Sequence, residues 1–286
     1  MTEPGIDGTP QPAGLRRRAR YSFFGARLNQ WLGRRADAQR MCRRALSYCD
    51  YTKAYRLLSE LELPAEHYFK LLARVHRHVR PATYLEVGVS RGESLKLVAP
   101  ETLALGIDPQ PRVACSLAAN QRIFTQTSDE FFARSDVPGL LGDRPLEMAF
   151  IDGMHHFEYA LRDFINIEPL CRRQSLIFIH DCFPIDARSA ERHQTTAFWS
   201  GDIWRLMVLL KKYRPDLAIR TLGTPPTGLG LITQLDPAST VLRSRLPQLI
   251  AEGLALDFSA IAQRRAEALN LVPGDWPHVR QLLDSR

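Results

Sequence analysis

The stretch that decides the fold is Tyr84-Leu85-Glu86-Val87-Gly88-Val89-Ser90-Arg91-Gly92-Glu93-Ser94. Its first half belongs to the apolar run Thr83–Val87, which predicts a short buried strand, and the segment Glu93–Val98 after the turn predicts a helix. Glycines at 88 and 92 let the backbone pass close to a ligand, and the start of a helix offers unpaired N–H groups. A strand, a glycine-rich turn and a helix in this order are typical of a nucleotide-type site.

The same alternation continues after this unit. A second apolar run, Leu103–Ile107, ends in Asp108, and the pair of strands with a helix between them indicates a parallel sheet. Further strands are predicted at 122–127, 146–151 and 175–179, further helices at 157–170 and 203–213, and a hairpin from strands 217–222 and 228–235 around Thr224-Pro225-Pro226-Thr227. The predicted fold class is α/β: a Rossmann-like, doubly wound, seven-stranded and mostly parallel sheet with an antiparallel C-terminal hairpin and an N-terminal helical cap.

Four regions follow from these patterns. Residues 1–20 are expected to be a disordered basic leader, and 21–80 an N-terminal helical cap with helices near 21–35, 37–61 and 65–79. Residues 81–237 hold the sheet, and 238–286 form a C-terminal tail of two or three short helices that breaks at Pro273-Gly274-Asp275.

The composition excludes several classes of protein. With 45% hydrophobic and 24% charged residues among 286, the chain is in the ordinary globular range. The most apolar stretch, Thr221 to Leu235, contains two prolines and three glycines, so no integral membrane segment is expected. The five cysteines are odd in number and contain no CxxC, which favours reduced thiols over disulfides or zinc. Because the N-terminus has no apolar signal region, we expect a cytoplasmic protein.

The basic charge is concentrated at the N-terminus. Residues 1–80 hold 16 Lys and Arg against 7 Asp and Glu, whereas the rest of the chain holds 22 against 24. A solvated leader is the favoured interpretation, and no nucleic-acid partner is expected. Tyr21, Phe24, Leu28, Trp31 and Leu32 recur at helical spacing between arginines, as in a helix that caps the main domain. Peripheral contact with an anionic membrane through this segment is the alternative left open.

Asp108 strengthens the interpretation of the glycine turn. It ends the next strand some twenty residues later, where a carboxylate can accept hydrogen bonds from both hydroxyls of a ribose. An acid before the turn and Ser90 in place of a middle glycine depart from dinucleotide oxidoreductases, and here the chain resembles the class I S-adenosylmethionine-dependent methyltransferases. That resemblance implies that Glu86, Gly88, Ser90 and Gly92 surround the methionine part of S-adenosylmethionine, that Asp108 holds its ribose, and that Ser128 and Asp129 contact adenine.

A second block narrows the resemblance. Ile151-Asp152-Gly153-Met154-His155-His156-Phe157-Glu158, followed by Asp163, Pro169-Leu170 and His180-Asp181, is similar to the I-D-G-x-H pattern of catechol and macrocin O-methyltransferase-like enzymes. The resemblance covers about residues 80 to 237. The chain departs from the family at Arg172-Arg173-Gln174, where Pro-Gly-Gly is usual before the fifth strand.

Asp152 and Asp181 end neighbouring strands, so their carboxylates are expected to converge on the ligand crevice. Two acids at that edge are a candidate Mg²⁺ site, and in related enzymes the matching acids bind such a metal. Asp152 is also expected to contact the cofactor. The alternative is structural, with Asp152 capping a helix and Asp181 fixing a loop.

His155 is the favoured general base, because an imidazole can take a hydroxyl proton at neutral pH. In macrocin-type enzymes a histidine three residues after the strand-four aspartate has this role, and His155 stands three after Asp152. His156 and His180 remain alternatives for the base. The long segment 183–200 is a candidate substrate loop, in which Arg188, Arg192, His193 and Trp199 could hold an anionic or sugar-like acceptor.

The resulting hypothesis is an S-adenosylmethionine-dependent methyltransferase that acts on a hydroxyl of a small molecule or glycan. Two alternatives stay open: a metal-independent N- or C-methyltransferase, and a catalytically inactive Rossmann-like binding protein. The oligomeric state is also left open, with a homodimer as one alternative.

Overall fold

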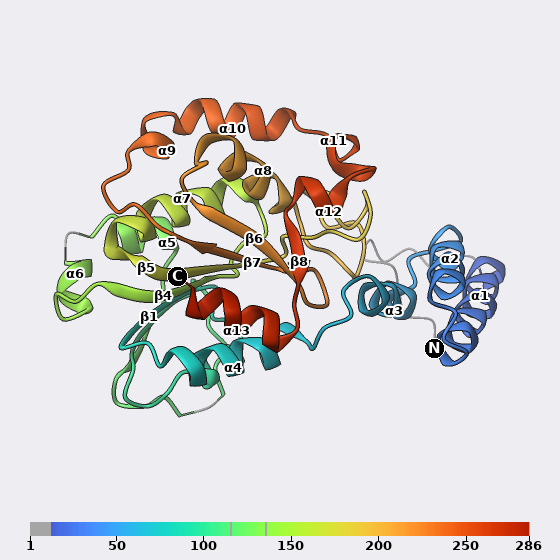
Figure 1. Cartoon of the computed structure of the whole chain (residues 1–286), viewed down its shortest axis with the longest axis horizontal. Coiled ribbons are helices and arrows are strands. Elements are labelled where there is room, and N and C mark those ends of the chain that lie inside the picture. Colours follow the sequence, from blue (N-terminus) through green and yellow to red (C-terminus); the bar gives the residue numbers. More distant parts are fainter. Residues whose placement is uncertain (1–12, 115, 135, 286) are drawn as a thin grey trace.

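The computed structural model describes residues 13–285 except 115 and 135, and its centre is one sheet with helices on both faces (Figure 1). The strand order in this part of the chain is β3-β2-β1-β4-β5-β7-β6-β8. The strands are β1 (Thr83–Val87), β2 (Leu103–Ile107), β3 (Gln121–Phe124), β4 (Leu146–Ile151), β5 (Cys171–His180), β6 (Ala218–Gly223), β7 (Leu229–Thr233) and β8 (Leu271–Pro273).

The predicted doubly wound topology is confirmed. Strands β3, β2, β1, β4 and β5 are mutually parallel, and β7 pairs antiparallel with both β5 and β6. The described sheet has eight strands rather than the seven expected, because β8 pairs in parallel with β6. We expected only helices around this segment, since three residues directly before Gly274 give too short an apolar run to predict a strand.

Side-chain alternation along the strands supplies the two halves of the core. In β4, Ala149 and Ile151 pack on one face, while Met148 and Phe150 pack on the other. Helices α7 (Phe157–Ile167), α8 (Trp204–Tyr213) and α10 (Leu246–Ala255) cover the first face, and α4 (Tyr68–Val79) and α13 (Trp276–Asp284) cover the second (Figure 1). Because β3, β2, β1, β4 and β5 are parallel, their carboxyl ends lie along the same edge of the sheet.

The remaining helices are short or lie at the ends of the chain. They are α1 (Ala13–Trp31), α2 (Arg35–Leu46), α3 (Thr52–Glu62), α5 (Ser128–Phe132), α6 (Val137–Leu140), α9 (Val241–Ser244), α11 (Ser259–Ala262), α12 (Arg265–Ala268) and the 3-10 turns η1 (Leu95–Leu97) and η2 (Glu168–Leu170). None of the helices in the described part of the chain is long and apolar enough to cross a membrane.

The predicted helix at 93–98 is wrong. Only the 3-10 turn η1 forms there. Pro100 follows closely and disfavours helical backbone at the residue before it, so the segment has no room for several turns. The turn after β1 thus has no long helix whose N-terminus could serve as an anion site.

We predicted one helix over residues 37–61, and this is wrong in the middle of the segment. The chain forms two helices there, α2 and α3, and is not helical between them. In this break Asp50 accepts a hydrogen bond from the backbone N–H of Ala197 at 2.8 Å, a distant contact that local propensity cannot reveal. The C-terminal tail breaks near Pro273 as predicted, although it holds more helices than expected.

The N-terminal prediction needs two corrections. Residues 13–20 are helical within α1, whereas we expected a disordered leader; residues 1–12 of that leader lie outside the described residues. The predicted apolar stripe is helical but does not pack on the main domain: α1 is buried instead through Ala19, Ser22 and Ala26. These small side chains and the partly buried Phe23 pack toward the other N-terminal helices, whereas Tyr21, Phe24, Leu28 and Trp31 are exposed.

Candidate active site

The glycine turn after β1 is tightly built. Gly88 has a φ of +91°, and a Cβ placed there would lie 2.0 Å from the carbonyl oxygen of Asp152, so glycine is required. Ser90 is also in the left-handed region, with a φ of +47°. Its backbone N–H donates a hydrogen bond to Asp108 Oδ2 at 2.7 Å, and the N–H of Gln110 donates to Oδ1 at 2.7 Å. Asp108 therefore ties the ends of β1 and β2 together and keeps lone pairs for a ligand.

Glu86 lies behind this turn rather than beside a ligand. Its side chain is fully buried and accepts hydrogen bonds from the hydroxyls of Tyr84 at 2.7 Å and Ser94 at 2.6 Å. Burial raises the pKa of Glu86 to about 8, although these two hydroxyls favour the charged form. Glu86 consequently stabilises the turn from its buried side.

A cavity of about 720 Å³ opens in front of the turn. It brings together six of the residues expected to bind the cofactor, namely Gly88, Ser90, Asp108, Ser128, Asp129 and Asp152. His155, the expected general base, lines it as well. Glu86 and Gly92 are not part of its lining. A cleft of this size, with a few polar groups on an apolar wall, is typical of a small-molecule site.

Ser128 and Asp129 begin α5 at the far side of this cavity. The helix is capped by Thr127, whose hydroxyl and backbone exchange hydrogen bonds with Glu130, so neither Ser128 nor Asp129 is needed as the cap. Asp129 forms an ion pair with Arg162 at 3.0 Å. Ser128 hydrogen-bonds to Asp163, whose pKa is raised by burial to about 7.

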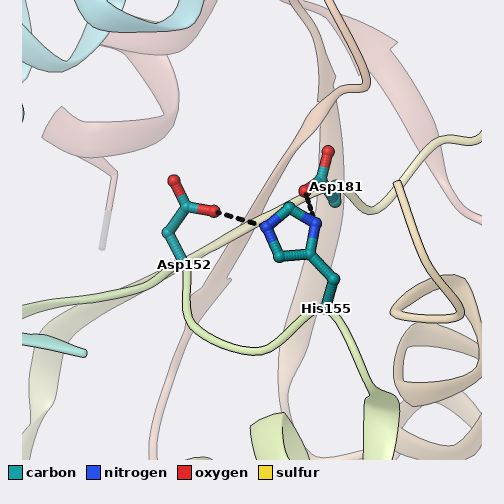
Figure 2. A group of neighbouring side chains, drawn as sticks. All are labelled: Asp152, His155 and Asp181. Atoms are coloured by element: carbon teal, nitrogen blue, oxygen red, sulfur yellow. Dashed lines mark ion pairs between the residues drawn. The ribbon is translucent and has the colours of Figure 1, made fainter. Parts of the chain in front are cut away.

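His155 stands between two carboxylates, as Figure 2 shows. Its Nδ1 lies 2.7 Å from Asp181 Oδ2, and its Nε2 lies 3.9 Å from Asp152 Oδ1. Both His155 and Asp181 have left-handed backbone, with φ of +57° and +62°. Such conformations are uncommon for residues other than glycine and occur preferentially at functional sites. The expected convergence of Asp152 and Asp181 is present.

His180, the last residue of β5, completes the cluster. Its Nδ1 is 3.1 Å from Asp152 Oδ1 and 3.4 Å from Asp181 Oδ2, and its ring stacks on Tyr68 with centroids 4.0 Å apart. His156 points elsewhere, with Nε2 at 3.1 Å from the carbonyl oxygen of Arg192. Of the three histidines left open as the base, His155 and His180 are therefore in the site.

Charges in this cluster stabilise one another. Burial disfavours the protonated rings, but Asp181 and Asp152 outweigh it and raise the pKa values of His155 and His180 above the ordinary value. Burial would likewise raise the pKa of Asp181, yet the two histidines hold it well below its usual range. The cluster is thus a set of ion pairs in which the charge of each histidine depends on the neighbouring carboxylates.

Asp152, His155 and Asp181 each offer a ligand atom, and these atoms lie within 4.8 Å of one another. The arrangement does not fit Mg²⁺ well. Magnesium prefers oxygen ligands, whereas one of the three groups is an imidazole. Both oxygens of Asp181 are also engaged by the protein, since Oδ1 accepts a hydrogen bond from the Thr227 hydroxyl and Oδ2 faces His155 Nδ1. The cluster suits proton transfer better than magnesium coordination.

A second cavity, of about 650 Å³, meets the first one at His155 and His180. Its walls come from α3, the segment 183–200 and the hairpin turn, and they include Arg56, Glu60, His67, Trp199 and Thr227. The ring of Trp199 stacks on that of His155 with centroids 5.1 Å apart and planes 8° apart. One face of the His155 ring is thereby covered by an aromatic side chain.

Only one of the four residues predicted to hold an acceptor lines this cavity, and that residue is Trp199. Arg192 instead pairs with Glu158 and with Asp202, and Arg188 donates to the carbonyl oxygen of Leu46. His193 is exposed and does not line the cavity. Sequence reasoning missed Tyr68, Arg56 and His67, because no local motif connects the N-terminal helices with the ends of β4 and β5.

The site residues that follow β1, β2, β4 and β5 lie within a segment that matches a known protein family. Residues 85–182, about a third of the chain, match a family model described as a methyltransferase domain. None of the curated proteins matches the sequence.

Similar solved structures include the O-methyltransferase TomG from Streptomyces achromogenes, involved in tomaymycin synthesis and solved with S-adenosylmethionine. Its identity is 19%, the match covers 59% of this chain and 80% of that chain, and the TM-score is 0.46. An O-methyltransferase from Bacillus cereus, solved with S-adenosylhomocysteine, is 14% identical over 58% of this chain and 79% of that chain, with a TM-score of 0.42.

Identities and TM-scores this low do not support an assignment of function. The assignment to a methyltransferase domain depends instead on the family match and on the order of the strands in the sheet. The matched residues run from β1 through the glycine turn, Asp108 and the Asp152–His155 segment to Asp181 and Cys182, the two residues that follow β5. The chain carries a methyltransferase domain over residues 85–182, and the prediction of a class I methyltransferase is confirmed.

Proposed function

We propose that this protein is an S-adenosylmethionine-dependent O-methyltransferase that acts on a hydroxyl of a small molecule or glycan. The observation that carries the proposal is the position of His155. Its ring lies on the wall shared by the two cavities, with the Asp181 carboxylate 2.7 Å behind Nδ1. A base at the junction of two cavities can serve an acceptor in one and a methyl donor in the other.

The first cavity is the proposed cofactor site. Asp108 would accept hydrogen bonds from the ribose hydroxyls, Ser128 and Asp129 would lie near adenine, and Gly88 and Ser90 would border the methionine part. Asp152 directly follows β4 and lines the same cavity. Glu86 and Gly92 would act through the shape of the turn, since neither lines this space.

The second cavity is the proposed acceptor site, because it reaches His155 from the opposite side. In the transfer, the acceptor oxygen forms a bond to the methyl carbon, and the carbon–sulfur bond breaks with its electron pair moving to sulfur. The hydroxyl proton moves to His155 Nε2. Asp181 stabilises the imidazolium that results, in the manner of the aspartate in Asp–His pairs. Arg56 and Glu60 would hydrogen-bond to polar groups of the acceptor at the cavity wall.

The first test concerns the cofactor. Calorimetry should show binding of S-adenosylhomocysteine and no binding of NAD. Asp108→Ala should weaken S-adenosylhomocysteine by about 1–3 kcal/mol, the scale of lost hydrogen bonds to a charged group. Glu101→Ala is a charge-matched control, because Glu101 is an exposed acid just before β2, at the end of that strand opposite Asp108. Tight NAD binding would overturn the proposal.

The second test separates proton transfer from metal assistance. A panel of hydroxylated sugars and phenols with radiolabelled S-adenosylmethionine should identify an acceptor, and the label should be attached to oxygen. His155→Asn should lower the rate by ~10²–10⁴, the usual contribution of a general base. Asparagine is the suitable replacement because it tolerates the left-handed backbone at this position.

His193→Asn, on an exposed residue of the same loop region, should leave the rate unchanged. EDTA should have no effect. If EDTA abolishes turnover and Mg²⁺ restores it, Asp152 and Asp181 bind a metal as first expected, and the metal-free mechanism fails. Label on nitrogen or carbon would instead favour the alternative methyltransferases, and binding of the cofactor without turnover on any acceptor would favour a binding protein.

A further inference from the structure

The two opposite faces of helix α1 carry different kinds of side chain. The packed face buries the small residues Ala19, Ser22 and Ala26, and Phe23 is partly buried beside them. The opposite face carries the large apolar residues Tyr21, Phe24, Leu28 and Trp31, which are 61%, 56%, 57% and 81% exposed. We call these four residues the aromatic face.

Apart from Phe23, this distribution is the opposite of an ordinary amphipathic helix, which turns its large apolar residues inward. The four residues follow one another at intervals of three, four and three, so they form one continuous stripe along the helix. Large exposed apolar groups that gather on one surface are characteristic of interaction sites, whereas scattered single ones are not. The aromatic face therefore has the character of an interaction site.

Charges around the stripe indicate the chemistry of that partner. Between residues 13 and 36 the chain has seven arginines and no acidic residue. Arg17 and Arg20 lie over the rings of Tyr21 and Phe24, at 5.6 and 5.5 Å from the ring centroids. The basic groups thus border the aromatic face itself, and a complementary surface must combine apolar contact with negative charge.

We propose that the aromatic face of α1 binds to the surface of an anionic lipid bilayer. Tyrosine and tryptophan are favoured at the boundary between headgroups and acyl chains, and arginines beside them attract anionic headgroups. Two copies of this chain paired through the same face would bring their arginines together without acids to offset them, so a second copy fits less well.

The position of the helix suits a broad, flat partner. Figure 1 places α1 at the outer edge of the molecule, beyond α2 and away from the sheet. Because α1 packs through its opposite face, contact through the aromatic face leaves the packing of α1 undisturbed. The proposal does not depend on the activity assigned to the two cavities.

The test uses the full chain with vesicles of phosphatidylcholine, alone or with about 30 mol% phosphatidylglycerol. Sedimentation should show the protein on the anionic vesicles at about 0.15 M salt, with binding reduced at high salt and little binding to the neutral ones. Trp31 emission should shift to shorter wavelength on binding. Trp31→Phe should keep binding and lose the shift, which assigns the signal to this residue.

The double variant Phe24→Ser and Trp31→Ser should weaken binding at least about tenfold. The matched control is Val241→Ser with Leu254→Ser, two exposed apolar residues in the C-terminal helices, which should bind as the original chain does. Arg17→Gln with Arg20→Gln should reduce binding and its salt dependence. Thermal unfolding should match across all variants, since every altered side chain is exposed.

Unchanged binding of the Phe24 and Trp31 double variant would overturn the proposal. Absence of the original chain from anionic vesicles would do the same. Sedimentation velocity supplies the decisive comparison with a second copy: a dimer that the double variant converts to a monomer, together with no vesicle binding, would assign the aromatic face to self-association instead.

Discussion

At the scale of single residues, His155 owes its chemistry to neighbours from three segments. Its backbone follows β4, Asp181 comes from the end of β5, and Trp199 covers its ring from the segment 183–200. The carboxylates raise its pKa, so more of the ring is protonated at neutral pH than in a free histidine. A base must be deprotonated to act, and the rate therefore depends on pH in a definite direction.

We expect kcat/KM for methyl transfer to rise with pH and to level off above a pKa higher than 6.5, the ordinary value for histidine. The observed pKa will belong to the coupled pair of His155 and His180. Asp181→Asn removes one carboxylate that favours the protonated ring, so the rise should move to lower pH while the plateau falls. Asparagine tolerates the left-handed φ of this position.

Asp284→Asn is the control for this experiment, because Asp284 also pairs with a histidine, His78, at 2.7 Å, on the surface. It should leave the pH profile unchanged. A rise that stays at the same pH in Asp181→Asn would mean that the titrating group is not part of this cluster.

Some residues of the site could be predicted from the sequence, and others could not. Asp108, Asp152, His155 and Asp181 were predictable, because each follows a strand whose carboxyl end faces the crevice. The position of Glu86 behind the turn was not, since its partners Tyr84 and Ser94 give no sequence signal of their depth. Tyr68 was missed for a different reason: its contact with His180 joins segments far apart in the chain.

At the scale of elements, the turns that hold the site are packed backbone against backbone. Gly201, just before α8, has a φ of +64°, and a Cβ placed on it would lie 2.0 Å from the carbonyl oxygen of His155. Asp202 then accepts a hydrogen bond from the N–H of Phe157 at 2.8 Å, which anchors the start of α7. The position of His155 is therefore set by the segment 200–203 as well as by its own loop.

Gly201→Ala should lower the free energy of unfolding by at least about 1–3 kcal/mol, because it combines a left-handed backbone with a collision against backbone. Methyl transfer should fall as well, since His155 must move. Gly139→Ala provides the comparison: Gly139 lies in α6, its added Cβ meets nothing within 4 Å, and it should leave stability and rate nearly unchanged. Denaturant titration measures the first quantity. Equal stability of the two variants would contradict the prediction.

Elements with strong periodicity were predicted well, and those decided by distant contacts were not. Strand β4 has the predicted bounds, because five of its six residues are apolar and the run lies between Pro145 and Asp152-Gly153. The break between α2 and α3 depends on the contact of Asp50 with Ala197, and β8 depends on pairing with β6. Neither contact leaves a local pattern, so propensity alone could not locate them.

At the scale of the whole molecule, the two cavities belong to different parts of the chain. The first is enclosed by the ends of the parallel strands with α4 and α5, whereas the second needs α3 and the segment 183–200. The N-terminal helices are held to that segment by Tyr55, whose hydroxyl donates to Asp186 Oδ2 at 2.8 Å and whose ring stacks on Phe198 with centroids 5.1 Å apart. We therefore expect loss of this contact to change the second cavity and to leave the first cavity unchanged.

Tyr55→Phe tests this division. The variant keeps the stacked ring and removes one buried hydrogen bond, whose loss costs about 0.5–1.5 kcal/mol. Local opening of the segment 183–200 should then become roughly 2- to 10-fold more frequent, and tryptic cleavage after Arg188, followed by mass spectrometry, should accelerate to the same degree. Affinity for S-adenosylhomocysteine should stay unchanged, while the KM for an acceptor found by the panel should rise.

The matched control for this prediction is Tyr48→Phe. Tyr48 accepts a hydrogen bond from Arg44 at 3.1 Å on the surface of the same helical region, away from Asp186, so its loss should change neither cleavage nor KM. Faster cleavage in Tyr48→Phe as well would show a general loosening of the N-terminal helices. Weaker cofactor binding in Tyr55→Phe would contradict the division itself, because it would mean that contacts made by α3 also shape the cavity in front of Gly88 and Asp108.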